Sequence, residues 1–248
     1  MSSLLGTHSL GSAWKRLRDQ WRMLGPAQTA ALLLGTLDDR YLRLFDRRYR
    51  VQTSGFIQLN TTSFTPARLR DATQYGPANG WAVRRLFRKL KLPTACQFCD
   101  LGSGLGRICI LAAEHGFSKV TGVELAPELC AKARENIAHC RLSDTQRGRI
   151  EILEMDVLNY CATTEDDVFF MFRPFSIEFL VVVLARLADR AQSRQRGLVL
   201  IYSERAALNV QHGETIAAHS AYKKQEEIIF WGQKFYVFHC GPIARPTA

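Results

Sequence analysis

Apolar residues recur with two different periods along the chain, and the change comes near residue 95. Before it, they recur every three or four residues, as on one face of an amphipathic helix. After it, short apolar runs alternate with helical patterns, which is typical of a parallel sheet covered on both faces. We therefore expect a helical N-terminal extension followed by an α/β domain.

The N-terminal part predicts helices over 12–24, over about 27–34 and from Asp38 onward. The third has an expected apolar side of Tyr41, Leu42, Leu44 and Phe45. Pro77 is expected in the first turn of a further helix that stops before Pro93, because proline suits that position. The Thr- and Ser-rich segment between these helices predicts extended chain.

In the α/β part, strands are expected at 96–101, 119–124, 149–155, 167–172, 197–202, 226–231 and 234–240. Helices are expected at 106–115, 127–140, 176–192 and 205–219. A tight turn near Gly232 makes the last two strands an antiparallel hairpin. The predicted fold is a Rossmann-like, doubly wound, seven-stranded α/β sheet that ends in this hairpin.

The predicted domains follow the same division. Residues 1–91 form a basic, mostly helical extension and cap, residues 92–240 form the α/β domain, and residues 241–248 form a tail. The charge is divided in the same way: residues 1–91 hold 16 Lys and Arg against 5 Asp and Glu, and the rest holds 17 against 18. Such an excess favours an acidic partner at the N-terminal part, either nucleic acid or an anionic surface, although solvated helix faces would account for it equally well.

No apolar run approaches the roughly 20 residues of a membrane helix, and no secretory signal is apparent. The cysteines number seven, which does not suit a disulfide framework, and Cys96 and Cys99 have no second pair at metal-ligand spacing. We expect buried thiols, no metal site, no transmembrane segment and a cytoplasmic protein.

The stretch DLGSGLGR carries the clearest chemistry, because it follows a predicted strand and opens a predicted helix. Glycines stand at 102, 104 and 106, whereas a dinucleotide turn needs its third glycine where Arg107 stands. No Gly-Lys-Ser/Thr follows, which excludes a phosphate-binding P-loop. The carboxylate of Asp100 suits a ligand with positive charge, and S-adenosylmethionine carries both an ammonium and a sulfonium.

With these features, residues 95–240 resemble the class I S-adenosylmethionine-dependent methyltransferases, whose sheet also ends in an antiparallel hairpin. The resemblance implies that the acid and the glycine turn hold the methionine part of the cofactor. It also implies that Glu124 holds the ribose hydroxyls and that Asp156 meets the adenine amino group. The full cofactor site that it implies is Asp100, Gly102, Ser103, Gly104, Gly106, Glu124, Leu125, Asp156, Val157 and Phe172.

The resemblance places the acceptor at the end of the fourth strand, with Arg173, Phe175 and Tyr75 as substrate residues. Family members that methylate exocyclic or amide nitrogens have Asn or Asp followed by Pro-Pro and an aromatic residue. Arg173 accepts no hydrogen bond, so it suits a substrate carboxylate or phosphate instead. A surface salt bridge for Arg173 and core packing for Phe175 remain alternatives.

No general base stands out from the sequence. The candidates are Tyr75, Glu178, Tyr202 and Glu204, and the catalytic residues stay unassigned. For His115, His139, His212 and His219 we expect surface or capping roles.

Three functional hypotheses remain open. The first is methyl transfer to an unidentified small-molecule or protein acceptor, and the layout before the glycine turn resembles a group of bacterial methyltransferases with a cap there. The second is a nucleic-acid or histone-lysine-type methyltransferase that docks through the basic N-terminal region. It draws on a similarity of the glycine turn to non-SET histone lysine methyltransferases. The third is a non-enzymatic cofactor-binding module at a membrane or partner surface.

Overall fold

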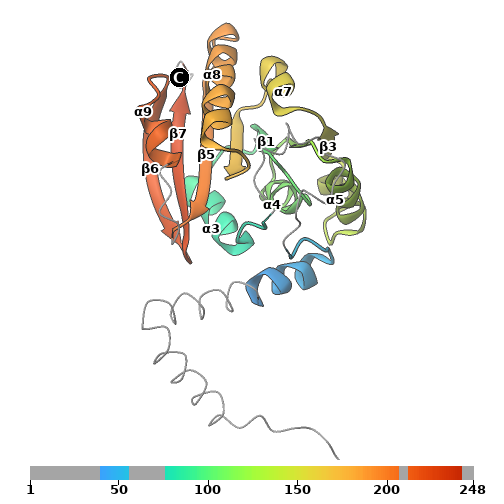
Figure 1. The fold of residues 1–248 in the computed structure, drawn as a ribbon. Coiled ribbons are helices and arrows are strands. Elements are labelled where there is room, and N and C mark those ends of the chain that lie inside the picture. Colours follow the sequence, from blue (N-terminus) through green and yellow to red (C-terminus); the bar gives the residue numbers. More distant parts are fainter. Residues whose placement is uncertain (1–39, 56–75, 207–211, 242–248) are drawn as a thin grey trace, which may run out of the picture. The chain divides into compact units, whose positions relative to one another are not determined.

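The computed structural model describes residues 40–55, 76–206 and 212–241 (Figure 1). The chain divides into two compact units, residues 1–41 and 42–248. Only Arg40 and Tyr41 of the first unit are described, so the fold below is that of the second. The predicted helices at 12–24 and 27–34 and the predicted substrate residue Tyr75 lie outside the described residues.

The described part contains one mixed sheet with the strand order β3-β2-β1-β4-β5-β7-β6 (Figure 1). Its strands are β1 (Gln97–Leu101), β2 (Lys119–Glu124), β3 (Ile150–Glu154), β4 (Val168–Phe172), β5 (Leu198–Arg205), β6 (Tyr222–Phe230) and β7 (Gln233–Cys240). The first five are parallel, and β7 is antiparallel to both of its neighbours, β5 and β6. The predicted seven-stranded sheet with a C-terminal hairpin is therefore confirmed.

Helices cover both faces of this sheet, as a doubly wound fold requires. The helices are α3 (Gly80–Leu90), α4 (Arg107–His115), α5 (Pro127–His139), α6 (Asp144–Arg147), α7 (Val157–Thr163), α8 (Ile177–Ser193) and α9 (His212–Ala218). Buried residues of α3, α4 and α5 form one hydrophobic cluster with the sheet, and those of α7, α8 and α9 form the other. No helix in the described ranges combines the length and apolarity of a bilayer span.

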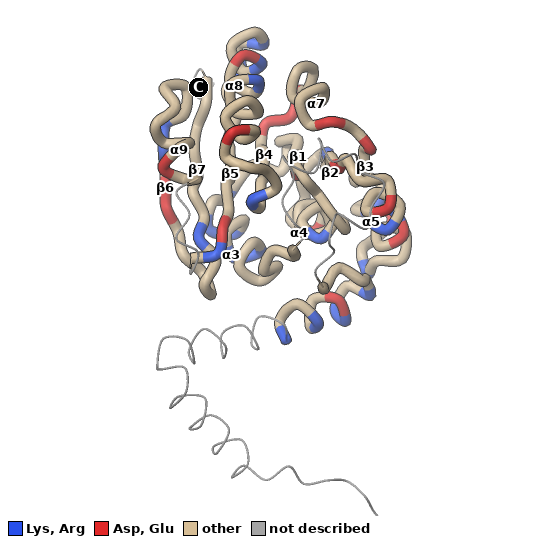
Figure 2. Tube along the Cα trace, viewed as in Figure 1, with Lys and Arg blue, Asp and Glu red and all other residues tan. Residues whose placement is uncertain are grey.

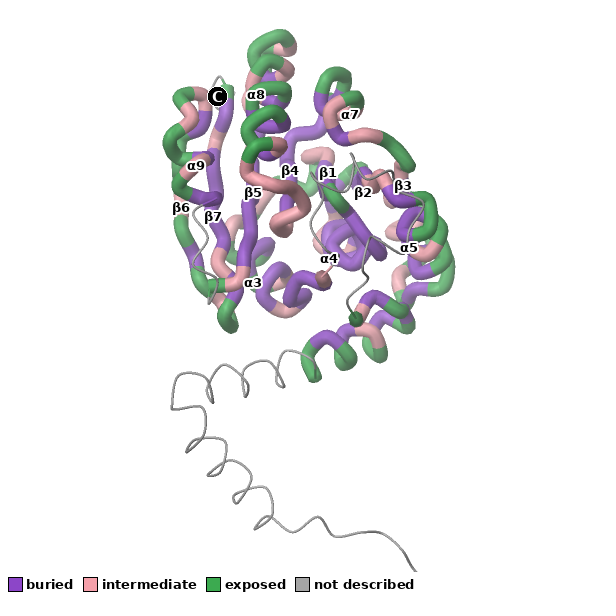
Figure 3. The backbone as a smooth tube through the Cα atoms, in the orientation of Figure 1, coloured by how far each residue is buried: buried purple, intermediate pink, exposed green. Residues whose placement is uncertain are grey.

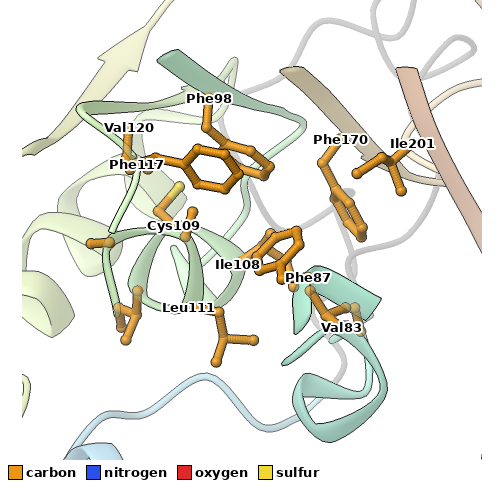
Figure 4. Packing of buried hydrophobic residues seen from close by; sticks show 14 of the residues in the cluster. Val83, Phe87, Phe98, Ile108, Cys109, Leu111, Phe117, Val120, Phe170 and Ile201 are labelled. Carbon is orange, nitrogen blue, oxygen red and sulfur yellow. The ribbon is translucent and has the colours of Figure 1, made fainter. Parts of the chain in front are cut away.

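The strands supply both clusters because their side chains alternate between the two faces. Phe98 of β1 lies in the first cluster, and the next residue, Cys99, lies in the second. Phe98 stacks on Phe117 with ring centroids 5.0 Å apart, and Phe87 of α3 packs edge-on against Phe98 at 5.6 Å (Figure 4). Purple colouring in Figure 3 follows β1, β4 and β5, which are buried along most of their length. Helix α3 thus shares one core with the sheet.

Two N-terminal predictions need correction. Pro77 does not open α3, because the helix begins at Gly80. Asn79 caps the helix, since its side-chain oxygen accepts hydrogen bonds from the amides of Trp81 and Ala82. The third predicted helix is present at 40–49, but Tyr41 and Leu44 are exposed. Its buried residues are Leu42, Phe45 and Tyr49, spaced by three and four, which is the helical period.

In the α/β part, the predicted helix at 205–219 begins too early. Strand β5 continues to Arg205 because β7 pairs with it as far as Gln233. The helix starts at His212, after a segment outside the described residues. The short helices α6 and α7 were not predicted, although Ser143 and Gln146 form a capping box on α6.

Candidate functional site

The candidate site lies where the winding of the sheet reverses. The chain runs outward from β1 to β2 and β3 and then returns to β4 on the other side of β1. In open α/β sheets, ligands bind at the carboxyl ends of the strands at this position. Asp100 lies on β1, Glu124 ends β2, and Asp156 follows β3 by two residues. The predicted acids therefore follow one edge across three adjacent strands.

The glycine turn connects β1 to α4 through left-handed backbone. The φ angles are +79° at Gly102, +53° at Gly104 and +81° at Gly106. The amides of Gly102 and Ser103 donate to the Val123 carbonyl at 2.9 and 3.0 Å, which fastens the turn to β2. Positive φ angles of this kind favour glycine over residues with a side chain.

Gly102 also lets the turn after β4 approach the turn after β1. A Cβ placed on Gly102 would lie 2.5 Å from the Cβ of Pro174. Real carbon atoms do not approach so closely, so this position requires glycine on steric grounds as well. The two turns that border the reversal point are therefore in direct contact.

Glu124 is held by backbone amides on both sides. Gly104 donates to its Oε2 at 2.9 Å, and Leu125 and Ala126 donate to its Oε1 at 2.8 and 3.0 Å. Burial raises the pKa of Glu124, while these three amides lower it in part. The carboxylate has about four acceptor positions, so three amide bonds leave room for a further donor.

Asp100 is buried below this edge rather than exposed at its rim, with 3% of its surface accessible. Its Oδ2 lies 4.0 Å from the Sγ of Cys109. Burial raises the pKa of Asp100 to about 8, and the nearby charge of Glu124 adds to the effect. A cation bound here would favour the ionised form.

The remaining predicted cofactor residues lie near the same edge. Asp156 caps α7, with Oδ1 accepting from the Leu158 amide at 2.8 Å, and Val157 is buried behind it. Leu125, which directly follows β2, and Phe172, the last residue of β4, are half-buried. Ser103 Oγ is buried and has no hydrogen-bond partner within the described ranges.

Arg107 is a structural residue that the sequence analysis used only to exclude a dinucleotide turn. Its side chain is buried and donates to Thr53 Oγ1 at 2.9 Å, to Ser54 Oγ at 3.2 Å and to Asp46 Oδ1 at 3.2 Å. It also lies 4.3 Å from the centre of the Phe45 ring. The arginine thereby fastens residues 42–54 to the start of α4.

Asn136 of α5 makes a second connection to the same segment. Its amide nitrogen donates to the carbonyl oxygens of Leu105 and Gln52 at 3.1 and 3.2 Å, and its Oδ1 accepts from the Gln52 amide at 2.9 Å. The glycine turn and the segment before it are therefore one hydrogen-bonded unit. The sequence offered one signal for the structural role of Arg107, namely its position directly after Gly106. Its side-chain hydrogen-bond partners could not be predicted, because they lie 53 to 61 positions away in the chain.

The predicted acceptor residues lie in the turn after β4. Arg173 has a φ of +44°, and its positive charge contributes to lowering the pKa of Tyr202, Glu204 and His212. Phe175 is half-buried and packs edge-on against Phe179 at 5.2 Å.

The candidate bases differ sharply in their surroundings. Glu178 is exposed at the start of α8. Tyr202 is buried, with its hydroxyl 2.6 Å from His212 Nδ1. Glu204 is 2% exposed; its Oε1 accepts from the Tyr236 hydroxyl at 3.1 Å, and its Oε2 has no partner in the described part of the chain.

The histidines and cysteines differ in how well they follow the sequence-based expectations. The surface or capping role expected for His212 is wrong, because this histidine is buried and bonded to Tyr202. All seven cysteines are unpaired, six of them buried and Cys96 half-buried, as expected. Among the described residues, no group of three or more His, Cys, Asp or Glu side chains has the arrangement of a metal site.

Comparison with known proteins gives the site a context. Residues 98–191 match a family model described as a methyltransferase domain. A ribosomal-protein methylase from Lactobacillus delbrueckii subsp. bulgaricus is similar in structure, with a TM-score of 0.52 and 16% identity over 68% of this chain and 81% of its own.

The glycopeptide N-methyltransferase MtfA is also similar, with a TM-score of 0.50 and 13% identity over 66% of this chain and 91% of its own. No curated protein sequence matches the chain significantly. The structural matches show a common fold, and the family match covers β1 to α8, which includes the glycine turn and all three acids.

Proposed function

We propose that the chain is a class I S-adenosylmethionine-dependent methyltransferase and that the residues described above hold its cofactor and its acceptor. The cofactor site consists of the glycine turn with Asp100, of Glu124 with Leu125, and of Asp156 with Val157 and Phe172. The observation that carries the proposal is Glu124, since three backbone amides orient its carboxylate beside the glycine turn.

The chemistry of these residues fits the cofactor. Ionised carboxylates accept charge-assisted hydrogen bonds from hydroxyl and ammonium groups, which are the polar groups of a ribose and of a methionine. Ser103 supplies a buried hydroxyl that lacks a partner in the described ranges. When bound, the cofactor supplies a methyl group activated by its attachment to a sulfonium.

The reaction requires this chain mainly to position the acceptor. Correct alignment of two reactants can lower a barrier by about 7–11 kcal/mol. We place the acceptor against Arg173 and Phe175, with Tyr75 as a further substrate residue. The acceptor itself is unidentified, and a small molecule or protein side chain is the leading class.

Calorimetric titration with S-adenosylmethionine tests the cofactor site. We expect Glu124→Ala to weaken binding by about 10- to 100-fold, because hydrogen bonds to a charged group contribute about 1.5–3 kcal/mol each. Glu135→Ala is the control, since Glu135 is an exposed carboxylate of α5 that pairs with Lys132. Unchanged affinity in the Glu124 variant would refute the site.

Methyl-labelled cofactor added to the protein and a host lysate tests the acceptor class. Separation of the label into protein, nucleic-acid and small-molecule fractions identifies which class is methylated. Label found only in the protein or small-molecule fraction supports the leading proposal. Label in the nucleic-acid fraction favours a nucleic-acid methyltransferase instead.

In the alternative, the protein is a nucleic-acid or histone-lysine-type methyltransferase whose basic N-terminal region binds an acidic partner. Its support is the excess of positive charge, part of which lies on α3 as Arg84, Arg85, Arg88 and Lys89 (Figure 2). Phosphate contacts would make binding to duplex RNA or DNA fall steeply with salt. Absence of binding at low salt would remove this proposal.

We retain two further proposals. Residues 1–91 act as an extension and cap, residues 92–240 as the cofactor-binding domain and residues 241–248 as a tail. A cytoplasmic location is supported by the unpaired cysteines, because reduced thiols are typical of that compartment.

A further inference from the structure

A buried carboxylate that the cofactor site does not use lies beside the proposed acceptor position. Glu204 is on β5, whose neighbour β4 ends at Phe172 opposite Ser203. Arg173 directly follows Phe172, and Glu204 directly follows Ser203. The two residues therefore lie at the same level of adjacent strands, which are about 4.8 Å apart in a sheet. This level is the carboxyl edge that also holds the glycine turn.

The surroundings of Glu204 leave one oxygen available. Tyr236 donates to Oε1 at 3.1 Å, while Oε2 is buried and has no partner within the described ranges. Leaving a buried polar atom without a partner is unfavourable, and more so when the atom is charged. Such an atom at the carboxyl edge of the sheet calls for a ligand that donates a hydrogen bond to it.

Arg173 cannot serve this purpose, because a guanidinium has donors only. Glu178, the other nearby acid of the turn after β4, is exposed. Among the described residues that border the end of β4, Glu204 is thus the buried carboxylate with a free acceptor position.

We propose that Glu204 receives a proton from the acceptor and that the acceptor is an amine bound as its ammonium form. The inference rests on the proposed methyltransferase function and specifies its substrate class. In the first step, an N–H bond of the ammonium breaks, and the proton passes to Glu204 Oε2. In the second, the freed nitrogen lone pair forms a bond to the cofactor methyl carbon, while the carbon–sulfur bond breaks and its electron pair stays on sulfur.

The electrostatic surroundings suit this role. Burial raises the pKa of Glu204, whereas the Tyr236 hydroxyl and the charges of Lys234 and Arg173 lower it and Glu227 raises it. A carboxylate whose pKa is raised toward neutrality is a better proton acceptor than an exposed one. Among the described residues, Tyr202 is a further titratable neighbour of Glu204, and its hydroxyl lies 2.6 Å from His212 Nδ1.

The decisive experiment uses the full-length protein with tritiated-methyl cofactor and a host lysate. We expect the transferred label to resist base and, after acid hydrolysis, to elute from a cation exchanger with N-methylated amines. Glu204→Gln keeps the size and the bond from Tyr236 but removes the proton acceptor, so we expect transfer to fall about 100-fold or more. The wild-type rate should rise with pH as Glu204 ionises, whereas the slow transfer by the variant should rise only at higher pH, where the amine loses its proton to water.

Cofactor affinity separates this inference from the proposed function. Glu204→Gln and Tyr236→Phe should bind S-adenosylmethionine as the wild type does, and Tyr236→Phe, which removes only the donor to Oε1, should slow transfer less than Glu204→Gln does. Base-labile label, or transfer by Glu204→Gln within threefold of the wild type, would overturn the inference. Loss of cofactor binding in both variants would make Glu204 a structural residue and would also overturn it. Failure of the wild type to bind the cofactor would instead refute the proposed function.

Discussion

The guanidinium of Arg107 lies 3.2 Å from the carboxylate of Asp46, and both groups are largely buried beside the glycine turn. The two residues are 61 positions apart in the chain. Asp46 also accepts hydrogen bonds from Thr53 and Ser54. This ion pair therefore joins the segment before the α/β domain to the first helix of that domain.

Removal of Asp46 should cost considerable stability. Asp46→Ala leaves a buried guanidinium without its ionic partner, which typically costs about 3–5 kcal/mol. Urea unfolding measures this loss in the free energy of unfolding. Lys132→Ala is the control, because Lys132 pairs with Glu135 on the surface, where such pairs contribute about 1 kcal/mol or less. Equal losses in the two variants would contradict the structural role of Arg107.

A methyl group on Gly102 should disrupt the contact between the two turns. Gly102→Ala is strained by its φ of +79° and also clashes with Pro174. Gly232→Ala, with a φ of +73° and open space around it, isolates the backbone strain, which is about 1–2 kcal/mol. We expect Gly102→Ala to be clearly less stable than Gly232→Ala and to bind S-adenosylmethionine more weakly.

The clash also predicts a rescue. Pro174→Gly removes the atom that a Cβ at position 102 would meet, whereas Pro174→Ala keeps it. Cofactor affinity in Gly102→Ala should therefore improve when Pro174→Gly is added and should stay low with Pro174→Ala. The same low affinity in both double variants would show that backbone strain at position 102, and not the clash with Pro174, weakens cofactor binding.

Asp100 should make stability depend on pH. Its pKa is raised to about 8 in the folded protein against about 3.9 in the unfolded chain. Between these values the native state binds the extra proton, so the contribution of Asp100 to stability falls as the pH rises from about 4 to 8. Asp100→Asn should remove this dependence. The comparison is made by urea unfolding of both proteins across this range, and parallel curves would contradict it.

The same shift predicts proton-linked cofactor binding. If a cationic ligand favours ionised Asp100, binding below pH 8 must release the proton, and affinity should rise with pH until about 8. Calorimetry in buffers of different ionisation enthalpy measures the released proton. Asp100→Asn should bind with no such release, and its presence in that variant would assign the proton to another group.

Gly213 provides an independent test of the Glu204 surroundings. A Cβ at this position would lie 2.3 Å from the Tyr236 ring, so Gly213→Ala must displace the ring that donates to Glu204. We expect slower methyl transfer with unchanged cofactor affinity. An unchanged transfer rate would show that the ring position does not matter for the reaction.

Local patterns along the chain were enough to predict the α/β domain. Alternating periods predicted the strands, and the resemblance carried by the glycine turn implied Asp100, Glu124 and Asp156 as cofactor residues, which belong to three adjacent strands of the sheet. These signals are local, and each depends only on residues close together in the chain.

The partners of residues that lie far apart in the chain could not be predicted from local patterns. Arg107 with Asp46, Gly102 with Pro174, and Glu204 with Tyr236 are contacts between elements distant in sequence. The sequence could not rank the four candidate bases. Glu178 and Glu204 differ in their exposure to solvent, and exposure depends on tertiary packing. The extent of β5 was decided in the same way, since pairing with β7 prolongs the strand beyond its local pattern.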